Sequence, residues 1–221
     1  MGAAIGEILG NAVGVAISPV PIIAVILMLF TARAAGNSLS FLAGWVIGLS
    51  VVGAVVLALG LESSNGEEST TGGWIKIVIG VLFLVLAVKQ WSSRPTGDDE
   101  PAMPGWMQAI DQFTAPKSFG IGFLLSAVNP KNLGLTIAAM TKVTAAGLST
   151  GEEIGTLAVF VVIASLTVAA PVVLNLILGS KAQPTLTTMK DWLAENNNTV
   201  MTVLFVVLGA KLLGDGIAVL A

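Results

Sequence analysis

The sequence contains neither cysteine nor histidine. Without cysteine the chain has no disulfide bond, no thiol redox chemistry and no thiolate metal site, and without histidine it lacks the commonest ligand of transition metals. The sequence also offers no set of convergent titratable groups of the kind that general acid–base catalysis needs. We therefore expect a protein that is not an enzyme and that uses no metal and no cofactor.

Charged side chains are scarce as well. They make up 10% of the residues, against about 25% in an ordinary soluble domain, while hydrophobic residues make up 55%. No run is rich in lysine or arginine, so nucleic acid is not an expected partner. Residues 39–61 and 155–179 carry no ionisable side chain, and each stretch could cross about 30 Å of hydrocarbon as a helix. These features predict an integral membrane protein.

Hydropathy and helix-breaking residues predict six transmembrane helices. They cover residues 5–31, 39–61, 73–91, 117–142, 152–179 and 197–219. The connection at 62–68 is acidic and lacks lysine and arginine, whereas Lys89, Arg94 and Lys117 surround the next connection. By the positive-inside rule the first connection lies outside and the second lies in the cytoplasm. We expect a multi-pass plasma-membrane protein with both termini outside.

Two of the cytoplasmic connections contain amphipathic segments. Each places four apolar residues, one of them tryptophan, on one helical face. They are Trp106, Met107, Ile110 and Phe113 in the first segment, and Leu186, Met189, Trp192 and Leu193 in the second. Two interpretations remain open: short interfacial helices with tryptophan at the headgroup level, or segments packed against the underside of the helix bundle.

The two halves of the sequence resemble each other. At one offset of 111 residues, Ser18-Pro19 matches Asn129-Pro130 and Ala35-Gly36 matches Ala146-Gly147; further on, residues 49–51 resemble 166–168 and residues 81–89 resemble 203–211. A unit of three helices therefore recurs, and because three is an odd number the second copy inserts upside down. The predicted fold is all-α, with inverted three-helix repeats at 1–95 and 117–221 joined by a cytoplasmic linker at 96–116 that carries an interfacial helix.

Each repeat is expected to break its first helix near the middle of the membrane. Proline removes a backbone donor and clashes with the preceding turn, so it frees carbonyl groups where water is absent. Paired breaks at equivalent points indicate a central substrate site, where the starts of the half-helices offer N–H groups to an anion. The alternative is a pair of kinks that only shape packing. The candidate substrate-binding residues are Ser18, Pro19, Pro21, Asn129, Pro130, Lys131 and Asn132.

Lys131 is the most informative of these residues, because a lysine at the bilayer centre costs about 2.5–3.5 kcal/mol and rarely occurs without a task. With Asn129 and Asn132 beside it, the segment could bind a carboxylate or a phosphate. Two structural interpretations remain open as well. Lys131 could form a buried ion pair with Glu7 or Asp215, or it could cap the freed carbonyl groups.

Two other polar pairs are spaced by one helical turn. Glu7 and Asn11 lie on the outer half of the first predicted helix, where Glu7 could take up a proton during transport or simply face water. We treat these two residues as weak candidates for coupling. Lys211 and Asp215, near the outer end of the last helix, are expected to pair with each other.

Glycine recurs every four residues in two places. Gly2, Gly6, Gly10 and Gly14 form one stripe, and Gly44 with Gly48 begins another. Such stripes let helix backbones approach closely. They are consistent with a tight helix pair inside the chain or with the seam of a homodimer, and the spacing does not distinguish the two.

These motifs resemble the lysine exporter (LysE) superfamily and, within it, the peptidoglycolipid-addressing protein (GAP) family. The resemblance is carried by residues 17–22 (ISPVPI), by Gly44 and Gly48, and by residues 123–133 (FLLSAVNPKNL). It implies an actinobacterial-type plasma-membrane protein of six helices, often dimeric, that takes part in the export of a complex envelope lipid or glycolipid. Amino-acid exporters of the superfamily carry Pro-Gly-Pro where this chain has Pro19-Val20-Pro21.

Three functions are therefore consistent with the sequence. The leading hypothesis is a lipid exporter or flippase in which the polar breaks pass a headgroup while the acyl chains stay in the membrane. The second is a proton-coupled exporter of a small amino-acid-like solute. The third is an assembly subunit that transports nothing and recruits enzymes of envelope synthesis through its tryptophan segments. Lipid or a small molecule, membrane lipids and a second copy of the chain are the expected partners.

Overall fold

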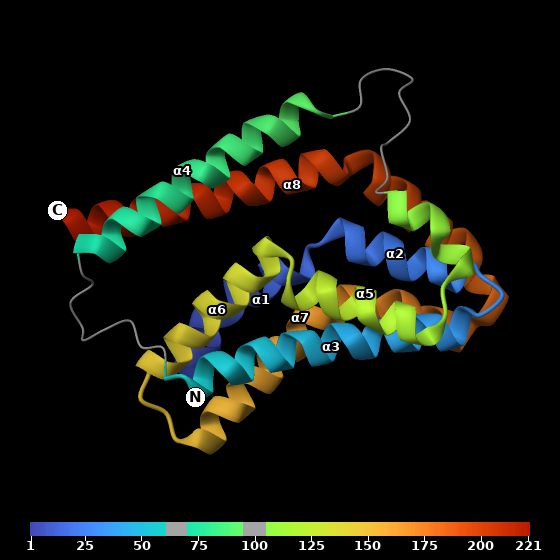
Figure 1. The fold of residues 1–221 in the computed structure, drawn as a ribbon, viewed down its shortest axis with the longest axis horizontal. Helices are drawn as coiled ribbons and strands as arrows, with labels where there is room; N and C mark the ends of the chain where they lie inside the picture. Colours follow the sequence, from blue (N-terminus) through green and yellow to red (C-terminus); the bar gives the residue numbers. More distant parts are fainter. Residues whose placement is uncertain (61–69, 95–104) are drawn as a thin grey trace. The chain divides into compact units, whose positions relative to one another are not determined.

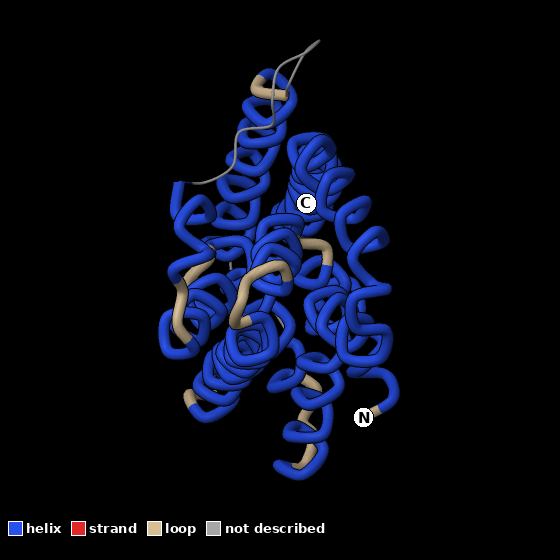
Figure 2. Tube along the Cα trace, turned by 90° about the vertical axis from the view of Figure 1, so that its right-hand side faces the viewer, coloured by secondary structure: helices blue, strands red, loops and turns tan. Residues whose placement is uncertain are grey.

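The computed structural model describes residues 1–60, 70–94 and 105–221. Over these ranges the chain is helical and contains no β-strand, which confirms the predicted all-helical class (Figures 1 and 2). The helices are α1 (Gly2–Ala16), α2 (Pro19–Leu29), α3 (Ala34–Ala58), α4 (Thr70–Ser92), η1 (Gly105–Gln112), α5 (Ala115–Ala127), α6 (Pro130–Ala145), α7 (Thr150–Leu178), η2 (Gly179–Ala182) and α8 (Gln183–Leu220).

The chain divides into two compact units. Unit 1 consists of Met1–Glu62 and Met103–Asp191, and unit 2 consists of Ser63–Ala102 and Trp192–Ala221. Each unit thus combines segments from both halves of the sequence, and α8 contributes its beginning to unit 1 and the rest to unit 2. The predicted repeats divide the chain differently, and they stay a prediction.

Several helices have the length and composition of membrane spans. Among the described residues, Ala34–Ala58 and the stretch Thr150–Leu220 qualify, and α1 with α2 form a third candidate that is bent by 53°. The chain is therefore a membrane protein. The six predicted segments all fall on helices, but η2 joins α7 to α8, so the last two segments belong to one helical stretch rather than to helices separated by a loop.

In unit 1, α3 and α5 run parallel and their backbones touch. A Cβ atom added to Gly44 would overlap the carbonyl oxygen of Phe119, and one added to Gly122 would overlap the carbonyl oxygen of Phe41. Only glycine allows so close an approach of two helices. The Gly44 and Gly48 stripe therefore serves a helix pair within the chain.

The glycine stripe at the start of α1 behaves differently. A Cβ atom added to Gly2, Gly6 or Gly10 would meet no atom within 4 Å, whereas one added to Gly14 would lie 3.0 Å from Leu135. Only the last glycine of this stripe packs against another described helix. The first three remain candidates for a seam between two copies of the chain.

Helix α1 lies antiparallel to α6 and parallel to α7. The Nζ atom of Lys142 donates to the carbonyl of Glu7 (3.2 Å), and Nδ2 of Asn11 donates to the carbonyl of Leu135 (3.3 Å). Residue numbers therefore increase along α1 in the direction in which they decrease along α6. The amino group of Met1 lies 3.7 Å from the Glu152 carboxylate near the start of α7, and Thr167 further along α7 donates to the carbonyl of Ala16 at the end of α1 (2.6 Å), so α1 and α7 run in the same direction. These contacts position the end of α1 between α6 and α7.

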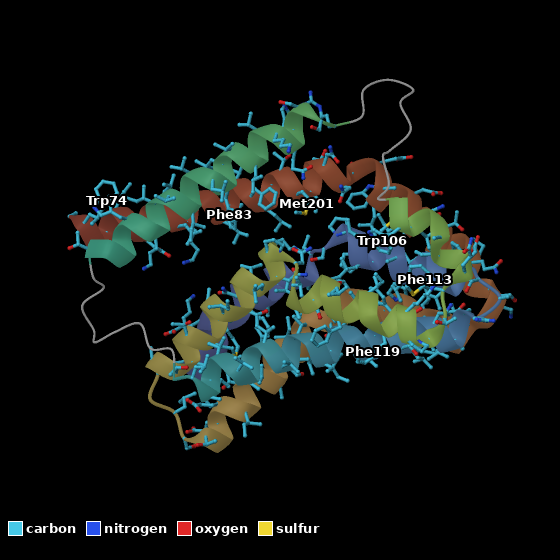
Figure 3. The ribbon with its side chains drawn as sticks, in the orientation of Figure 1. Trp74, Phe83, Trp106, Phe113, Phe119 and Met201 are labelled. Carbon is cyan, nitrogen blue, oxygen red and sulfur yellow. The ribbon has the colours of Figure 1, made fainter. Side chains whose placement is uncertain are left out.

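In unit 2, α4 and the second part of α8 form an antiparallel pair. Gly73 packs near the end of α8 while Gly80 packs against Gly209. The ring of Phe83, labelled on α4 in Figure 3, lies 5.5 Å from the ring of Phe205. The predicted pair of Lys211 with Asp215 is confirmed, at 2.7 Å.

The first amphipathic connection packs against the protein rather than standing apart from it. Met107, Ile110 and Phe113 are only 5%, 3% and 8% exposed, and η1 contacts α2. Trp106 is half-buried (Figure 3). The packed interpretation therefore holds for this segment. Residues 96–104, the first part of the predicted linker at 96–116, lie outside the described residues.

The second segment does not bury its four apolar residues together. Leu186 is fully buried, Met189 and Leu193 are half-buried, and Trp192 is 55% exposed. The helical face predicted for this segment is therefore only partly buried, and Trp192 lies at its exposed end.

Candidate functional site at the two helix breaks

Both predicted breaks are interruptions of a helix. The first separates α1, which ends at Ala16, from α2, which begins at Pro19, and the second separates α5, which ends at Ala127, from α6, which begins at Pro130. Each proline occupies the start of the new helix, where its fixed φ fits and its missing N–H is not needed. The sequence therefore located both breaks correctly.

The side chain of Lys131 connects the two breaks. From the first turn of α6 its Nζ atom donates to the carbonyls of Gly14 (2.9 Å) and Ile17 (2.8 Å) and to Oγ of Ser18 (2.6 Å). An ammonium group has three protons to donate, so all three are used. Lys131 is 7% exposed, which makes this a buried contact between α6 and the end of α1.

The partners of Lys131 within the described residues are all neutral. Asp215 instead pairs with Lys211, and Glu7 is exposed and accepts a hydrogen bond from Lys142 at its backbone carbonyl. The ion pair considered for Lys131 is therefore wrong, and the carbonyl cap is confirmed. Because α1 ends with the partial negative charge of its helix dipole, the ammonium group is favourable there.

The remaining carbonyl groups at the end of α1 are also paired. Oγ of Ser18 donates to the carbonyl of Val15 (2.7 Å), and Oγ1 of Thr167 donates to that of Ala16 (2.6 Å). Every carbonyl from Gly14 to Ile17 thus has a donor, as a helix end in a membrane requires. Sequence reasoning missed Thr167, although its alignment with Ser50 was visible in the repeat.

The second break is bonded mainly within its own half of the chain. Nδ2 of the fully buried Asn132 donates to the carbonyl of Leu125 (2.9 Å), and Oδ1 of Asn129 accepts from the backbone N–H of Lys131 (3.0 Å). In the described part of the chain, no hydrogen bond reaches the carbonyl of Ala127, the last residue of α5. The two breaks are therefore alike in sequence position but not in bonding.

The starts of α2 and α6 offer fewer N–H groups than the anion hypothesis assumes. Proline removes the N–H at positions 19, 21 and 130, and the N–H of Lys131 is taken by Asn129. An anion at these helix starts would meet few free backbone donors. A charged headgroup would have to interact mainly with the Lys131 ammonium group itself and replace at least one of its three bonds to the protein.

The candidate residues do not all meet at one point. Ser18, Lys131 and Asn132 are together, with Oγ of Ser18 lying 3.3 Å from Oδ1 of Asn132. Pro19 and Pro21 are buried in α2, Asn129 is half-buried and Pro130 is exposed. Their role in binding a substrate stays a prediction.

The weak coupling candidates lie away from the breaks. Glu7 is exposed near the start of α1, and Asn11 uses its side chain to bind the carbonyl of Leu135. Asn11 therefore has a packing role in this structure. A role in coupling stays a prediction for both residues.

In unit 1, three buried polar groups were not found from the sequence. Nε1 of Trp45 and the hydroxyls of Ser118 and Ser165 have no hydrogen-bond partner in the described part of the chain. They lie on α3, α5 and α7, within unit 1. Single serine or tryptophan residues in uncharged helices carry no sequence signal that marks them.

Paired broken helices joined by a buried lysine define a helical membrane protein with irregular backbone in its interior. The chain belongs to the family described as Sap, sulfolipid-1-addressing protein, whose model matches residues 8–218. The predicted membership of a lipid-addressing family is confirmed at this level. Neither the curated proteins nor the solved structures contain a match to the chain.

Proposed function

We propose that this protein is a plasma-membrane transporter that exports or flips a lipid or glycolipid of the cell envelope, and that it is not an enzyme. The observation that carries the proposal is the buried ammonium group of Lys131, which joins the two breaks inside a membrane protein. Irregular backbone in a membrane is tolerated where it is paired within the protein or lines a path for a polar group. The description of the family supports a lipid as the cargo.

The proposed architecture is six spans arranged as two inverted repeats, with a place in the lysine exporter superfamily. Helices α1 and α6 are antiparallel, as an inverted second copy requires. In unit 2, Phe83 and Phe205 occupy equivalent positions in the resembling segments 81–89 and 203–211, and their rings contact each other. Equivalent residues that touch are expected next to a two-fold axis.

The proposed topology can be tested with reporter fusions. A reporter that is active only in the cytoplasm should be active when fused after Gly97 and inactive when fused at Gly66, because the connection at 62–68 is acidic and the next one is basic. Both fusion points lie outside the described residues. The reverse pattern would place both termini in the cytoplasm and would overturn the orientation.

The proposed cargo can be tested in a deletion strain of the source organism. We expect an envelope lipid to accumulate in the plasma membrane and to fall in the outer envelope, with its total amount unchanged, when the two fractions are compared by mass spectrometry. Restoring the gene should reverse the change.

Other outcomes would reject lipid export. A fall in the total amount of the lipid would favour the assembly subunit, because synthesis rather than movement would have failed. Normal lipids with a loss of amino-acid release would favour the small-solute exporter. The homodimer is tested separately by the mass of the purified protein, and Gly2, Gly6 and Gly10 are its candidate seam.

A further inference from the structure

The two helix breaks differ in how the halves of the chain pack around them. At the offset of 111 residues, α1 corresponds to α5 and α6 corresponds to α2. Helix α1 packs along α6, but α2 and α5 form no comparable contact, and α2 packs against α3, α7 and η1. One of two equivalent helix pairs is therefore closed while the other is apart.

Side-chain hydrogen bonds show the same difference. Thr167 reaches across from the second half to the carbonyl of Ala16. The equivalent residues are Ser50 and Ala127, but Oγ of Ser50 donates to the carbonyl of Val46 in its own helix (2.8 Å), and the carbonyl of Ala127 has no donor among the described residues. The end of α1 is thus held by the opposite half, and the end of α5 is not.

Lys131 has no counterpart in the first half of the chain. The equivalent position is Val20, which cannot donate a hydrogen bond from its side chain. The three bonds from the ammonium group can therefore stabilise the closed α1–α6 pair, and no equivalent side chain stabilises a closed α2–α5 pair. An inverted repeat can exchange the arrangements of its two halves, and a contact present in only one arrangement shifts the equilibrium toward it.

We infer that Lys131 is a positioning residue that latches α1 against α6, and that its release lets α2 pack along α5 with Ser50 bonded to Ala127. This inference rests on the inverted repeat and the transport role proposed above. With both termini outside, the closed α1–α6 pair lies on the outer side of the membrane. The conformation described here is then the one closed to the outside.

Cross-linking can measure the two arrangements, because the chain has no native cysteine. The pair Glu7→Cys with Lys142→Cys reports the closed α1–α6 side, where Lys142 reaches the Glu7 carbonyl. The equivalent pair Thr31→Cys with Ser118→Cys reports the α2–α5 side. Both are treated with a short bifunctional methanethiosulfonate reagent in liposomes.

We expect the first pair to cross-link faster than the second in the natural chain. Burial of Ser118 also slows the second pair, so each variant is compared with the ratio of the natural chain. Lys131→Met should shift the ratio of the two rates by about tenfold toward the second pair, because a contact of one state only has been removed. Lys131→Arg, which keeps the charge, should restore most of the original ratio. Lys181→Met, at an exposed lysine of η2 that is adjacent in sequence to none of the four cysteines, is the matched control and should leave the ratio unchanged.

Two results would overturn the latch. An unchanged ratio in Lys131→Met would mean that Lys131 does not favour either arrangement. Slower cross-linking of both pairs, together with loss of a single peak in size-exclusion chromatography, would mean that Lys131 only supports the fold. The cross-linking measurement needs no substrate, so it tests the latch separately from transport. If Lys131→Met shifted the ratio but the natural protein moved no lipid, the role of Lys131 as a latch would stand and the proposed transport would be rejected.

Discussion

Gly44→Ala is expected to lower the free energy of unfolding by about 3 kcal/mol and to remove most of the folded protein from the membrane. The added Cβ atom would overlap the carbonyl oxygen of Phe119. This oxygen belongs to the backbone of α5, so no side-chain rotation relieves the overlap, and α3 and α5 must move apart. Unfolding in detergent, followed by circular dichroism, measures the loss.

The matched control is Gly36→Ala near the start of the same helix, which keeps the chemical change and removes the clash. A Cβ atom there would meet nothing within 4 Å, and alanine is favoured over glycine in a helix by about 0.5–1 kcal/mol. Gly36→Ala should therefore be as stable as the natural chain or slightly more so. Equal stability of the two variants would contradict the close packing of α3 on α5.

The two glycine stripes illustrate what spacing can predict. A four-residue period correctly indicates a helix face that allows close approach. It does not name the partner, because the partner is supplied by a helix that is distant in the sequence. Gly44 and Gly48 pack on α5, whereas Gly10, with the same spacing, faces open space in unit 1.

Lys131 shows the same limit at the candidate site. From the sequence, a buried charge at position 131 is expected to need partners, and the prolines at positions 19 and 130 indicate where backbone carbonyl groups lose their helical donors. Which partners the ammonium group takes depends on the antiparallel packing of α1 on α6, which places Gly14 and Ile17 within its reach. The residues around Lys131 do not by themselves predict that α6 packs on α1.

Amphipathic segments are ambiguous for a related reason. The apolar face of residues 105–113 could be buried at the boundary between headgroups and acyl chains of a membrane or, equally well, against a protein surface. In the structure α2 supplies that surface, so Met107 and Ile110 are buried. For Leu186 and Trp192 the helical period is correct but their burial differs, since Leu186 is fully buried and Trp192 is 55% exposed.

Lys131→Met is expected to reduce lipid movement at least about tenfold while most of the protein remains folded. The groups that lose their donor are the carbonyls of Gly14 and Ile17 and the hydroxyl of Ser18, which are neutral. Leaving such neutral groups buried without a donor lowers the free energy of unfolding by about 1–3 kcal/mol. Breaking a buried ion pair lowers it by about 3–5 kcal/mol. Removing a buried ammonium group also offsets part of this cost, because the charge no longer has to be desolvated.

The measurement compares the deletion strain complemented with natural protein, Lys131→Met, Lys131→Arg or Lys117→Met at equal protein levels. Lys117 is exposed and should be replaceable without loss, whereas arginine at 131 keeps a positive charge and should retain part of the activity. The outer-envelope lipid and the unfolding midpoint are read for each variant. If Lys131→Met moved lipid normally and unfolded at the same midpoint as the natural chain, neither a headgroup nor the end of α1 would depend on this charge, and Lys131 would be a residue that the chain tolerates without a task.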